Sequence, residues 1–567
     1  MASLWRTANR PRPESLKQAN AHTCKLLLNC YIRELAQEKR TQIRLKPQVS
    51  DYAIAFPASG VTVFGQLAYY SAMGEHEYNC MNWFNVQGEG GGVEFSALAR
   101  WIMTELEQTR LSTADTPLSA ALQAAFMDKI NNSCRNLALY IERSAEYVVY
   151  DYCSSEQALI YGHPFHPFPK HVSGFTGEDV QRYSPELRTS FQLAYFAVSK
   201  EVYREEWVAE ELKIELPESM TFELRRQLRE NQHQYTLLPA HPWQYEHVLA
   251  LPKVDAYVRS RKLIPLGVFG PAAYPTTSVR TVYIPEMNCN LKLPLNLQIT
   301  NMIRTNSDEQ MRRTMDASRY LLQQGGFGPD APAHIAYETG VTTCAFNDEA
   351  ITRLFTVAYR PIAFDQSCTF VMASLVEAPL SAAPSRLMDM INKGNISPEV
   401  WFEKYLEVSL LPLVRLAWTK GIHFEAHLQN TLLTIRNGLP ESFIVRDLEG
   451  VSVEQRLEPS EEQETAPPSP LFYSREQAWS RTSYYLFVNH LGSLIHAMAR
   501  DAKVPEEQYW YMVRQALRRE QARGDNGFAK YLLTVENFPA KRNMLSCLMD
   551  SGENPSYAEV PNMLREA

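Results

Sequence analysis

The stretch His423–Gly450, HFEAHLQNTLLTIRNGLPESFIVRDLEG, predicts a β-hairpin on which the rest of the chain is organised. Two short runs within it, 431–435 and 442–445, are rich in β-branched and apolar residues. The Asn437-Gly438 pair between them is typical of a tight hairpin turn. The sequence therefore predicts two antiparallel strands joined by this turn.

The open end of this hairpin is a candidate metal site. If the turn is centred on 437–440, Asn430 and Asp447 are equidistant from it, and we expect their side chains to meet. An amide and a carboxylate oxygen suit Mg²⁺, and kinase-like sites hold their metals with such a pair. A structural hairpin with polar ends is the alternative. The number of polar neighbours favours a nucleotide–metal site; they are Glu425, His427, Gln429, Arg446 and Glu449.

Length and composition limit the class of protein. The chain has 567 residues, so we expect two to four subdomains, and its 45% hydrophobic and 21% charged residues are ordinary for a globular protein. A net charge of −8 gives no sign of a nucleic-acid partner.

The nine cysteines are scattered without a CxxC pair, and we expect neither a zinc knuckle nor a disulfide framework. The first 20 residues contain no apolar signal-peptide core, and no window approaches a membrane span. We therefore expect a cytoplasmic protein that does not contact a membrane.

Cationic and hydroxyl side chains gather in two further places. The segment 161–175 is dense in Pro, and so predicts a shaped loop that presents Lys170, Ser173 and imidazole groups to an anion, although a surface loop is the alternative. The segments 275–283 and 291–305 predict paired strands, with Ser278 and Arg280 on one face. In that pairing Arg280 and Lys292 could clamp one triphosphate, because two cations held together favour an anion between them.

Two long helices are predicted on either side of the hairpin. The segment 398–421 predicts an apolar helix with a kink at Pro412. The segment 479–502 predicts a helix that carries Arg481 and Tyr484 one turn apart, where they could equally form a solvated face.

Three motif blocks occur in order along the chain. They are GHPFHPFPK at 162–170, TSVRT with LKLPLNLQITNMIRT between 277 and 305, and HFEAHLQN with VRDLEG between 423 and 450. Together with NPSYAEVPN at 554–562, they resemble the NRPS-independent siderophore synthetases, the aerobactin-synthetase family. Within that family the blocks resemble the citrate-using staphyloferrin B-type subgroup.

The resemblance implies an α+β fold built as a cradle of thumb, fingers and palm, with a kinase-like palm. On this basis we expect a thumb at 1–175, fingers at 176–378 and a palm at 379–567. The implied reaction converts ATP and a carboxylate of citrate into an acyl-adenylate and pyrophosphate, and an amine or alcohol then attacks. ATP and Mg²⁺ are the implied cofactors, and we expect a homodimer.

The resemblance also implies roles for individual residues. The catalytic residues would be Arg280, Lys292 and His427. The residues that bind ATP would be His163, Lys170, Ser278, Val279, Arg280, Thr281, Lys292, Thr300, Gln429 and Asp447. Those that bind citrate would be Arg304, His427, Arg481, Tyr484 and Lys541, and those that bind metal would be Glu425, Asn430 and Asp447. Several cations suit a tricarboxylate, and adenylation needs positioning and charge neutralisation more than a strong base.

Two other functions stay open at this point. Glu425 lies five residues before Asn430, where a kinase places its base, so a small-molecule kinase fits the spacing. A siderophore-binding or ferric-reductase module would need clustered cysteines for an iron–sulfur centre, or a membrane anchor. The sequence does not identify the amine.

Overall fold

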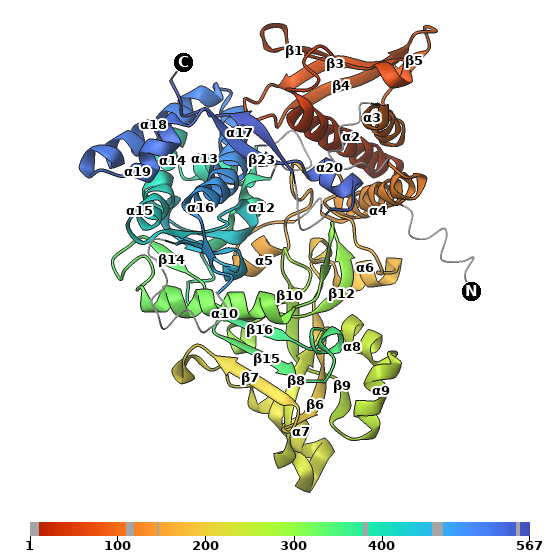
Figure 1. Ribbon diagram of the computed structural model, residues 1–567, viewed down its shortest axis with the longest axis vertical. Helices are drawn as coiled ribbons and strands as arrows, with labels where there is room; N and C mark the ends of the chain where they lie inside the picture. Colours follow the sequence, from red (N-terminus) through yellow and green to blue (C-terminus); the bar gives the residue numbers. More distant parts are fainter. Residues whose placement is uncertain are drawn as a thin grey trace.

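The computed structural model describes residues 11–108, 118–144, 147–377, 384–455, 469–551 and 556–566. It confirms the α+β class, with both helices and sheets along the whole chain. Figure 1 shows an N-terminal region at the top, a central region at the bottom and a C-terminal region at the left. Each region contains one of the three largest clusters of buried hydrophobic side chains in the described part of the chain.

The N-terminal region is an antiparallel sheet packed against helices. In β2 every second residue is buried, because one face of the sheet rests on those helices. The strands lie in the order β1 (Ile43–Lys46), β2 (Asp51–Phe56), β3 (Val61–Tyr69), β4 (Glu77–Asn85) and β5 (Gly90–Gly92). The helices are α2 (Pro13–Leu35), α3 (Phe95–Gln108), α4 (Ala120–Ser144) and, from the other end of the chain, α20 (Asn543–Leu548).

The central region contains an eight-stranded sheet in the order β7-β15-β16-β11-β10-β9-β6-β8. Its strands are β6 (Phe191–Ser199), β7 (Tyr203–Trp207), β8 (Tyr235–Ala240), β9 (Leu263–Pro275), β10 (Thr281–Ile284), β11 (Cys289–Lys292), β15 (Gly340–Cys344) and β16 (Val357–Pro361). Around it lie α5 (Tyr152–Glu156), α6 (Gly177–Tyr183), α7 (Glu218–Leu228), α8 (Pro242–Leu249), α9 (Pro252–Arg259), α11 (Glu349–Thr352) and the pair β12 (Leu295–Ile299) and β13 (Met302–Arg304).

The C-terminal region holds the predicted hairpin within a four-stranded sheet, β14 (Ala333–Ile335), β20 (Leu439–Val445), β19 (Thr431–Arg436) and β17 (Thr369–Val371). Its helices include α10 (Asp308–Gln323), α12 (Met372–Val376), α13 (Arg386–Lys393), α14 (Pro398–Val408), α15 (Leu410–Lys420), α16 (Arg475–Thr482), α17 (Gly492–Ala502), α18 (Glu506–Arg523) and α19 (Gly527–Thr534). Short strands complete it: β18 (Ile422–His423), β21 (Ser452–Glu454), β22 (Phe472–Tyr473), β23 (Asn537–Lys541) and β24 (Tyr557–Pro561).

The hairpin confirms the predicted turn and corrects the predicted register. Asn437 and Gly438 have φ of 53° and 78°, which is the conformation that a two-residue hairpin turn requires. The turn is centred between Asn437 and Gly438, one residue before the predicted centre of 437–440. A bulge between Thr434 and Ile435 moves the pairing one residue back toward the predicted register, so the amide of Arg446, and not that of Asp447, donates to the carbonyl of Asn430.

The predicted pairing between the segments 275–283 and 291–305 is confirmed in part. β10 and β11 pair as expected, with Thr281 opposite Lys292. Ser278 and Arg280 do not lie on a strand, because β9 ends at Pro275 and the chain turns before β10. The amide of Thr281 donates to the carbonyl of Ser278 at 2.6 Å and closes this turn.

The two long helices differ from prediction in detail. The chain breaks at Ser409 between α14 and α15, and Pro412 lies in the first turn of α15, where its missing N–H costs no hydrogen bond. The second helix is continuous from α16 to α17, with a π-helical segment at Ser483–Leu491. None of the helices in the described ranges has the length and apolar character of a membrane span.

Candidate active site

A buried charge cluster joins the central sheet to the end of the hairpin. Lys292, at the end of β11, donates at 2.9 Å both to Asp447 Oδ1 and to Glu449 Oε2, and its side chain is 5% exposed. Burial alone would raise the pKa of Asp447, but Lys292 and Arg360 outweigh it and lower that pKa. Asp447 has φ of 67°, an uncommon conformation for a non-glycine residue that the surrounding contacts hold in place.

Arg280 and Arg304 extend this cluster, and the sequence predicted that Arg280 would lie near Lys292. Arg280 Nη1 donates to Asn306 Oδ1 at 2.7 Å and to the carbonyl of Thr305 at 3.1 Å. The buried Nε of Arg280 has no partner in the described part of the chain. Burial, followed by the charge of Arg280, lowers the pKa of Arg304 to about 10. Arg280, Lys292 and Arg304 thus form a group of cations that would attract a polyanion.

A second group brings together four of the five predicted citrate residues. Lys541 donates to the hydroxyl of Tyr485 at 2.6 Å, and its ammonium lies 5.6 Å from the centre of the Tyr484 ring. The guanidinium of Arg481 lies 5.9 Å from the Tyr485 ring, and the His427 ring lies 5.8 Å from that same ring. The fifth residue, Arg304, lies with Arg280 instead.

Tyr485 was missed in the sequence, although it follows Tyr484 directly. Both tyrosines are buried, at 3% and 8% exposed, because they lie on the π-helical segment Ser483–Leu491. Such wide turns are frequent at functional sites, and no periodicity argument would have placed both rings in one cluster.

The turn before β10 is tied to the hairpin by polar contacts. Gln429 donates through Nε2 to the carbonyl of Thr277 at 3.0 Å. Arg446 donates to the carbonyl of Gln429 at 2.8 Å and forms a buried ion pair with Glu156. Glu156 in turn accepts from the amide of Thr277 at 3.1 Å. Glu156 was also missed, because it lies outside the motif blocks and only its burial marks it.

The remaining predicted nucleotide residues lie in different surroundings and do not form one group. Burial, followed by the charges of His427 and Arg33, lowers the pKa of His163 to about 3. Lys170 is paired with Glu186 at 2.7 Å and donates to the carbonyl of Leu159, so it supports the 159–163 loop. Val279 packs in a small apolar cluster. The amide of Thr300 donates to the carbonyl of His171 at 3.0 Å.

The predicted metal residues have separate partners. Glu425 forms an ion pair with Arg481, Asp447 is bound to Lys292, and Asn430 donates to the backbone carbonyl of Glu425 at 3.4 Å. Across the described ranges, no three His, Cys, Asp or Glu side chains are arranged as a metal site. Asp447 and Glu449 each contribute an oxygen within 2.9 Å of the ammonium of Lys292, so their carboxylates converge on one point.

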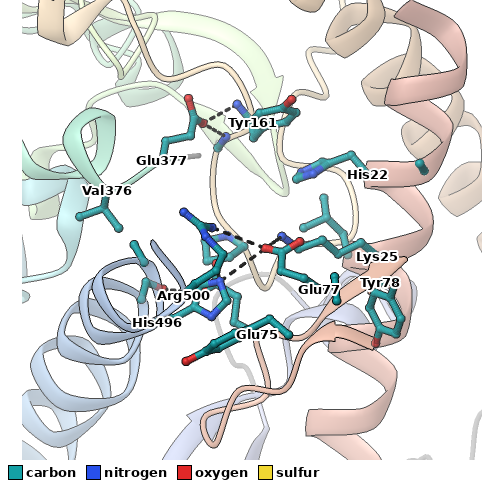
Figure 2. A pocket seen from close by; sticks show the side chains of 18 of the residues that line it. His22, Lys25, Glu75, Glu77, Tyr78, Tyr161, Val376, Glu377, His496 and Arg500 are labelled. Carbon is teal, nitrogen blue, oxygen red and sulfur yellow. Dashed lines mark hydrogen bonds and ion pairs between the residues drawn. The ribbon is translucent and has the colours of Figure 1, made fainter. Parts of the chain in front are cut away.

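A cavity of about 1090 Å³ adjoins this site (Figure 2). His163, His427 and Gln429 line one part of it. Side chains from α2, from the start of β4 and from α17 line another part.

Comparison with known proteins shows which family this architecture represents. Residues 151–376 match the IucA / IucC family. An L-2,3-diaminopropanoate–citrate ligase of Staphylococcus aureus is 32% identical over 97% of this chain and 96% of its own length. The chain belongs to the IucA/IucC family. This confirms the relationship that the three motif blocks indicated.

Other members of the family share the whole length of the chain. A spermidine–citrate ligase of Bacillus anthracis is 26% identical over 97% of this chain and 98% of its own length. The structure of ATP-bound aerobactin synthetase IucA from Klebsiella pneumoniae has a TM-score of 0.84 and 23% identity, and the match covers 96% of this chain and 100% of that one. The IucA/IucC fold therefore extends over almost the entire molecule.

A second match concerns the C-terminal region alone. Residues 399–556 match a ferric iron reductase FhuF-like transporter family. This stretch contains a single cysteine, Cys547, which is buried. Iron–sulfur clusters are held by several thiolates, so the stretch by itself lacks the ligands of such a centre.

Proposed function

We propose that this chain is an ATP-dependent siderophore synthetase that adenylates a carboxylate of citrate and condenses it with an amine or an alcohol, releasing AMP and pyrophosphate. The similarity to a diaminopropanoate–citrate ligase over 97% of the chain carries this proposal. The ATP-bound relative of the same fold supports the use of ATP. The gathering of Arg280 with Arg304, and of Arg481 with Lys541 around Tyr485, supports two anionic substrates.

The two groups of cations would bind different substrates, one ATP and the other citrate. Arg280 and Lys292 would contact the triphosphate, with Ser278, Val279, Thr281, Thr300, Gln429, His163 and Lys170 as the other proposed nucleotide residues. Lys292 is fixed by Asp447 and Glu449, so its ammonium is positioned before a ligand arrives. Arg304, Arg481, Lys541, Tyr484 and His427 would bind citrate, whose three carboxylates need several cations.

The chemistry follows from these positions. A citrate carboxylate oxygen attacks the α-phosphorus, and pyrophosphate leaves with the electrons of the broken P–O bond. Arg280 and Lys292 offset the charge on the leaving group. The amine nitrogen then bonds to the acyl carbon, and AMP leaves with the electrons of the C–O bond. His427 would accept the amine proton, since burial lowers its pKa and keeps its imidazole neutral.

Mg²⁺ fits the oxygen donors of Asp447 and Glu449, whose side chains are 36% and 27% exposed beside Lys292. Asn430 and Glu425 remain proposed ligands. Mg²⁺ takes most of its ligands from water and phosphate oxygens, so few protein donors are needed. When bound it would neutralise charge on the phosphates.

The finer architecture is proposed with the function. We propose a thumb (1–175), fingers (176–378) and a palm (379–567). The presence of three large cores supports a division into three, although the largest core also includes Met73 and Phe370 from the first two. The boundary at 378/379 lies outside the described residues. The central and C-terminal parts interlock, since β14 and β17 pair with the hairpin. The hairpin β19–β20 and the helices that follow residue 379 would form the kinase-like palm, and β14 and β17 from the proposed fingers complete its sheet. Nine free cysteines support a cytoplasmic location, and we propose a homodimer.

Pyrophosphate–ATP exchange in the absence of amine tests the proposal. We expect exchange that depends on citrate, whereas exchange that ignores citrate would contradict it. A small-molecule kinase is less favoured, because Glu425, which would be its base, is held by Arg481. Release of ADP in place of AMP would restore the kinase alternative.

A further inference from the structure

The cavity beside the active site contains a second cluster of charged side chains (Figure 2). Lys25 comes from α2, Glu75 and Glu77 from the chain that enters β4, and His496 and Arg500 from α17. None of these residues belongs to a motif block, and none contributes to the adenylation chemistry proposed above.

The cluster mixes both signs of charge at close range. Lys25 Nζ lies 2.5 Å from Glu77 Oε1, and Arg500 Nη1 lies 3.8 Å from the same oxygen. Arg500 is also paired with Asp501 at 2.8 Å, so a ligand carboxylate would share this guanidinium with it. Glu75 accepts from the hydroxyl of Ser493 at 2.7 Å. The side chains of Lys25, Glu75, Glu77 and Arg500 are 13–23% exposed, so each still presents part of its surface to the cavity.

The imidazole of His496 is the buried centre of this cluster. Its ring nitrogens lie 4.0 Å from Glu75, 3.4 Å from Glu77 and 3.7 Å from Glu506, and its side chain is 2% exposed. Neither nitrogen makes a well-aligned hydrogen bond to another described residue. The three carboxylates within 4.0 Å favour a charged imidazole, so His496 adds a cation to the acidic side chains at this end of the cavity.

The cavity connects this charged cluster to the proposed adenylation site. His163, His427 and Gln429 line the same cavity, and these are residues of the proposed adenylation site. A molecule held between the charged cluster and these residues would have a reactive group close to the acyl-adenylate. Fixing a nucleophile in this way can account for a large part of a rate enhancement.

We propose that this cavity binds the amine substrate, and that it selects a diamine that also carries a carboxylate. Glu75 and Glu77 would hold one ammonium group, and Arg500 would hold the carboxylate. The second amine, which loses its proton, then points toward His427 and attacks the acyl carbon, and AMP leaves. This inference rests on the proposed function and specifies its second substrate.

The mixed charge separates this class from a plain polyamine. A pocket for a polyamine would need carboxylates without nearby cations, because like charges repel in a buried site. Here Lys25, His496 and Arg500 lie among the carboxylates, so a ligand with both charges is better matched.

The test separates amide formation from adenylation. With citrate and ATP, the purified chain is given either 2,3-diaminopropanoate or 1,2-diaminoethane, which lacks only the carboxylate. We expect kcat/KM to favour the first by about tenfold or more, the effect of one charge-assisted contact. An equal or reversed preference would overturn the selection of a carboxylate.

Two variants locate the binding groups. Glu75→Gln should raise KM for both amines by about tenfold, and Arg500→Gln should lower kcat/KM for 2,3-diaminopropanoate alone by a similar factor. Citrate-dependent pyrophosphate exchange should stay within about twofold in each, because adenylation precedes amine binding. Glu89→Gln and Arg519→Gln, at exposed positions, are the matched controls.

The outcomes remain distinguishable from failure of the proposed function. Absence of citrate-dependent pyrophosphate–ATP exchange in the unaltered chain would contradict the proposed function itself. Intact exchange with unchanged amine KM in both variants would overturn the cavity assignment alone. If the variants lose exchange, Glu75→Asp and Arg500→Lys are measured, and loss of exchange in these too would assign the cluster to adenylation or folding and overturn the proposal.

Discussion

Two buried charge clusters, one around Lys292 and one around His496, differ in how the chain assembles them. Lys292, Asp447 and Glu449 all lie in motif blocks, at the ends of paired strands. The second cluster joins residues such as Glu75 and Ser493, which are 418 positions apart and belong to no motif. The first cluster suits the chemistry that every citrate adenylation requires, and the second suits a choice of amine.

Removal of the central cation of the first cluster should have the largest effect. Lys292→Ala leaves the partly exposed carboxylates of Asp447 and Glu449 without their shared cation, which should cost about 1–3 kcal/mol of stability. Citrate-dependent exchange should fall by about a thousandfold, since one preorganised charge is lost. Denaturant unfolding and pyrophosphate exchange measure the two effects. Exchange within tenfold of the unaltered rate would remove Lys292 from the reaction.

A change among the citrate residues should be smaller and specific. Arg481→Ala removes a guanidinium that lies 5.2 Å from the Tyr473 ring and is paired with Glu425. We expect KM for citrate to rise about tenfold to a hundredfold, with KM for ATP little changed. Arg518→Ala, on the exposed side of α18, is the control. Equal increases for both substrates would contradict the separation of the two pockets.

The second cluster should reveal itself in the pH dependence of stability. Burial opposes the charge on His496, but Glu75, Glu506 and Glu77 raise its pKa from 6.5 to about 9. Because the folded pKa is the higher one, the stabilisation is complete below pH 6.5 and is lost as pH rises toward 9. His496→Gln should remove a pH-dependent contribution of about 2–3 kcal/mol.

Arg500 and His76 face the same imidazole and are unchanged in this variant, so the difference between the two stability curves isolates His496. Parallel curves between pH 6 and 9 would show that this imidazole is not charged in the folded state.

The smallest effect is expected at the hairpin turn. Gly438 has φ of 78°, and an added Cβ would lie 2.8 Å from Ile396 Cδ1. Gly438→Ala should therefore cost about 1 kcal/mol or somewhat more in unfolding free energy. Ala at the exposed neighbouring strand position Glu441 provides the comparison. A neutral Gly438→Ala would mean that the turn relaxes without cost.

The sequence predicted features that local chemistry decides. Asn437-Gly438 specified the turn, and the alternating apolar residues specified β19 and β20. The bulge between Thr434 and Ile435 was not predictable, because one extra residue in a strand leaves the apolar pattern almost unchanged. The sequence predicted a kink at Pro412, whereas the helix breaks at Ser409. Proline is disfavoured inside a helix but tolerated in its first turn, so Pro412 marks the start of a new helix and not a kink within one.

The candidate site shows the same division. Arg280, Lys292 and Asp447 were found because each lies in a motif block, although Asp447 is 155 positions from Lys292. The amine cavity was not found, since Lys25, Glu75 and Arg500 come close only after the N-terminal sheet packs against α17. The sequence also did not show that Glu425 and Lys170 are occupied by ion pairs. Their partners, Arg481 and Glu186, lie outside the motif blocks.

The products of a complete reaction test the central claim most directly. The chain is incubated with ATP, citrate and 2,3-diaminopropanoate, and AMP, pyrophosphate and the citryl amide are quantified together. We predict equal amounts of all three products, and none when citrate is omitted. ADP and phosphate in their place, or AMP formed without an amide, would contradict an acyl-adenylate that is passed to an amine.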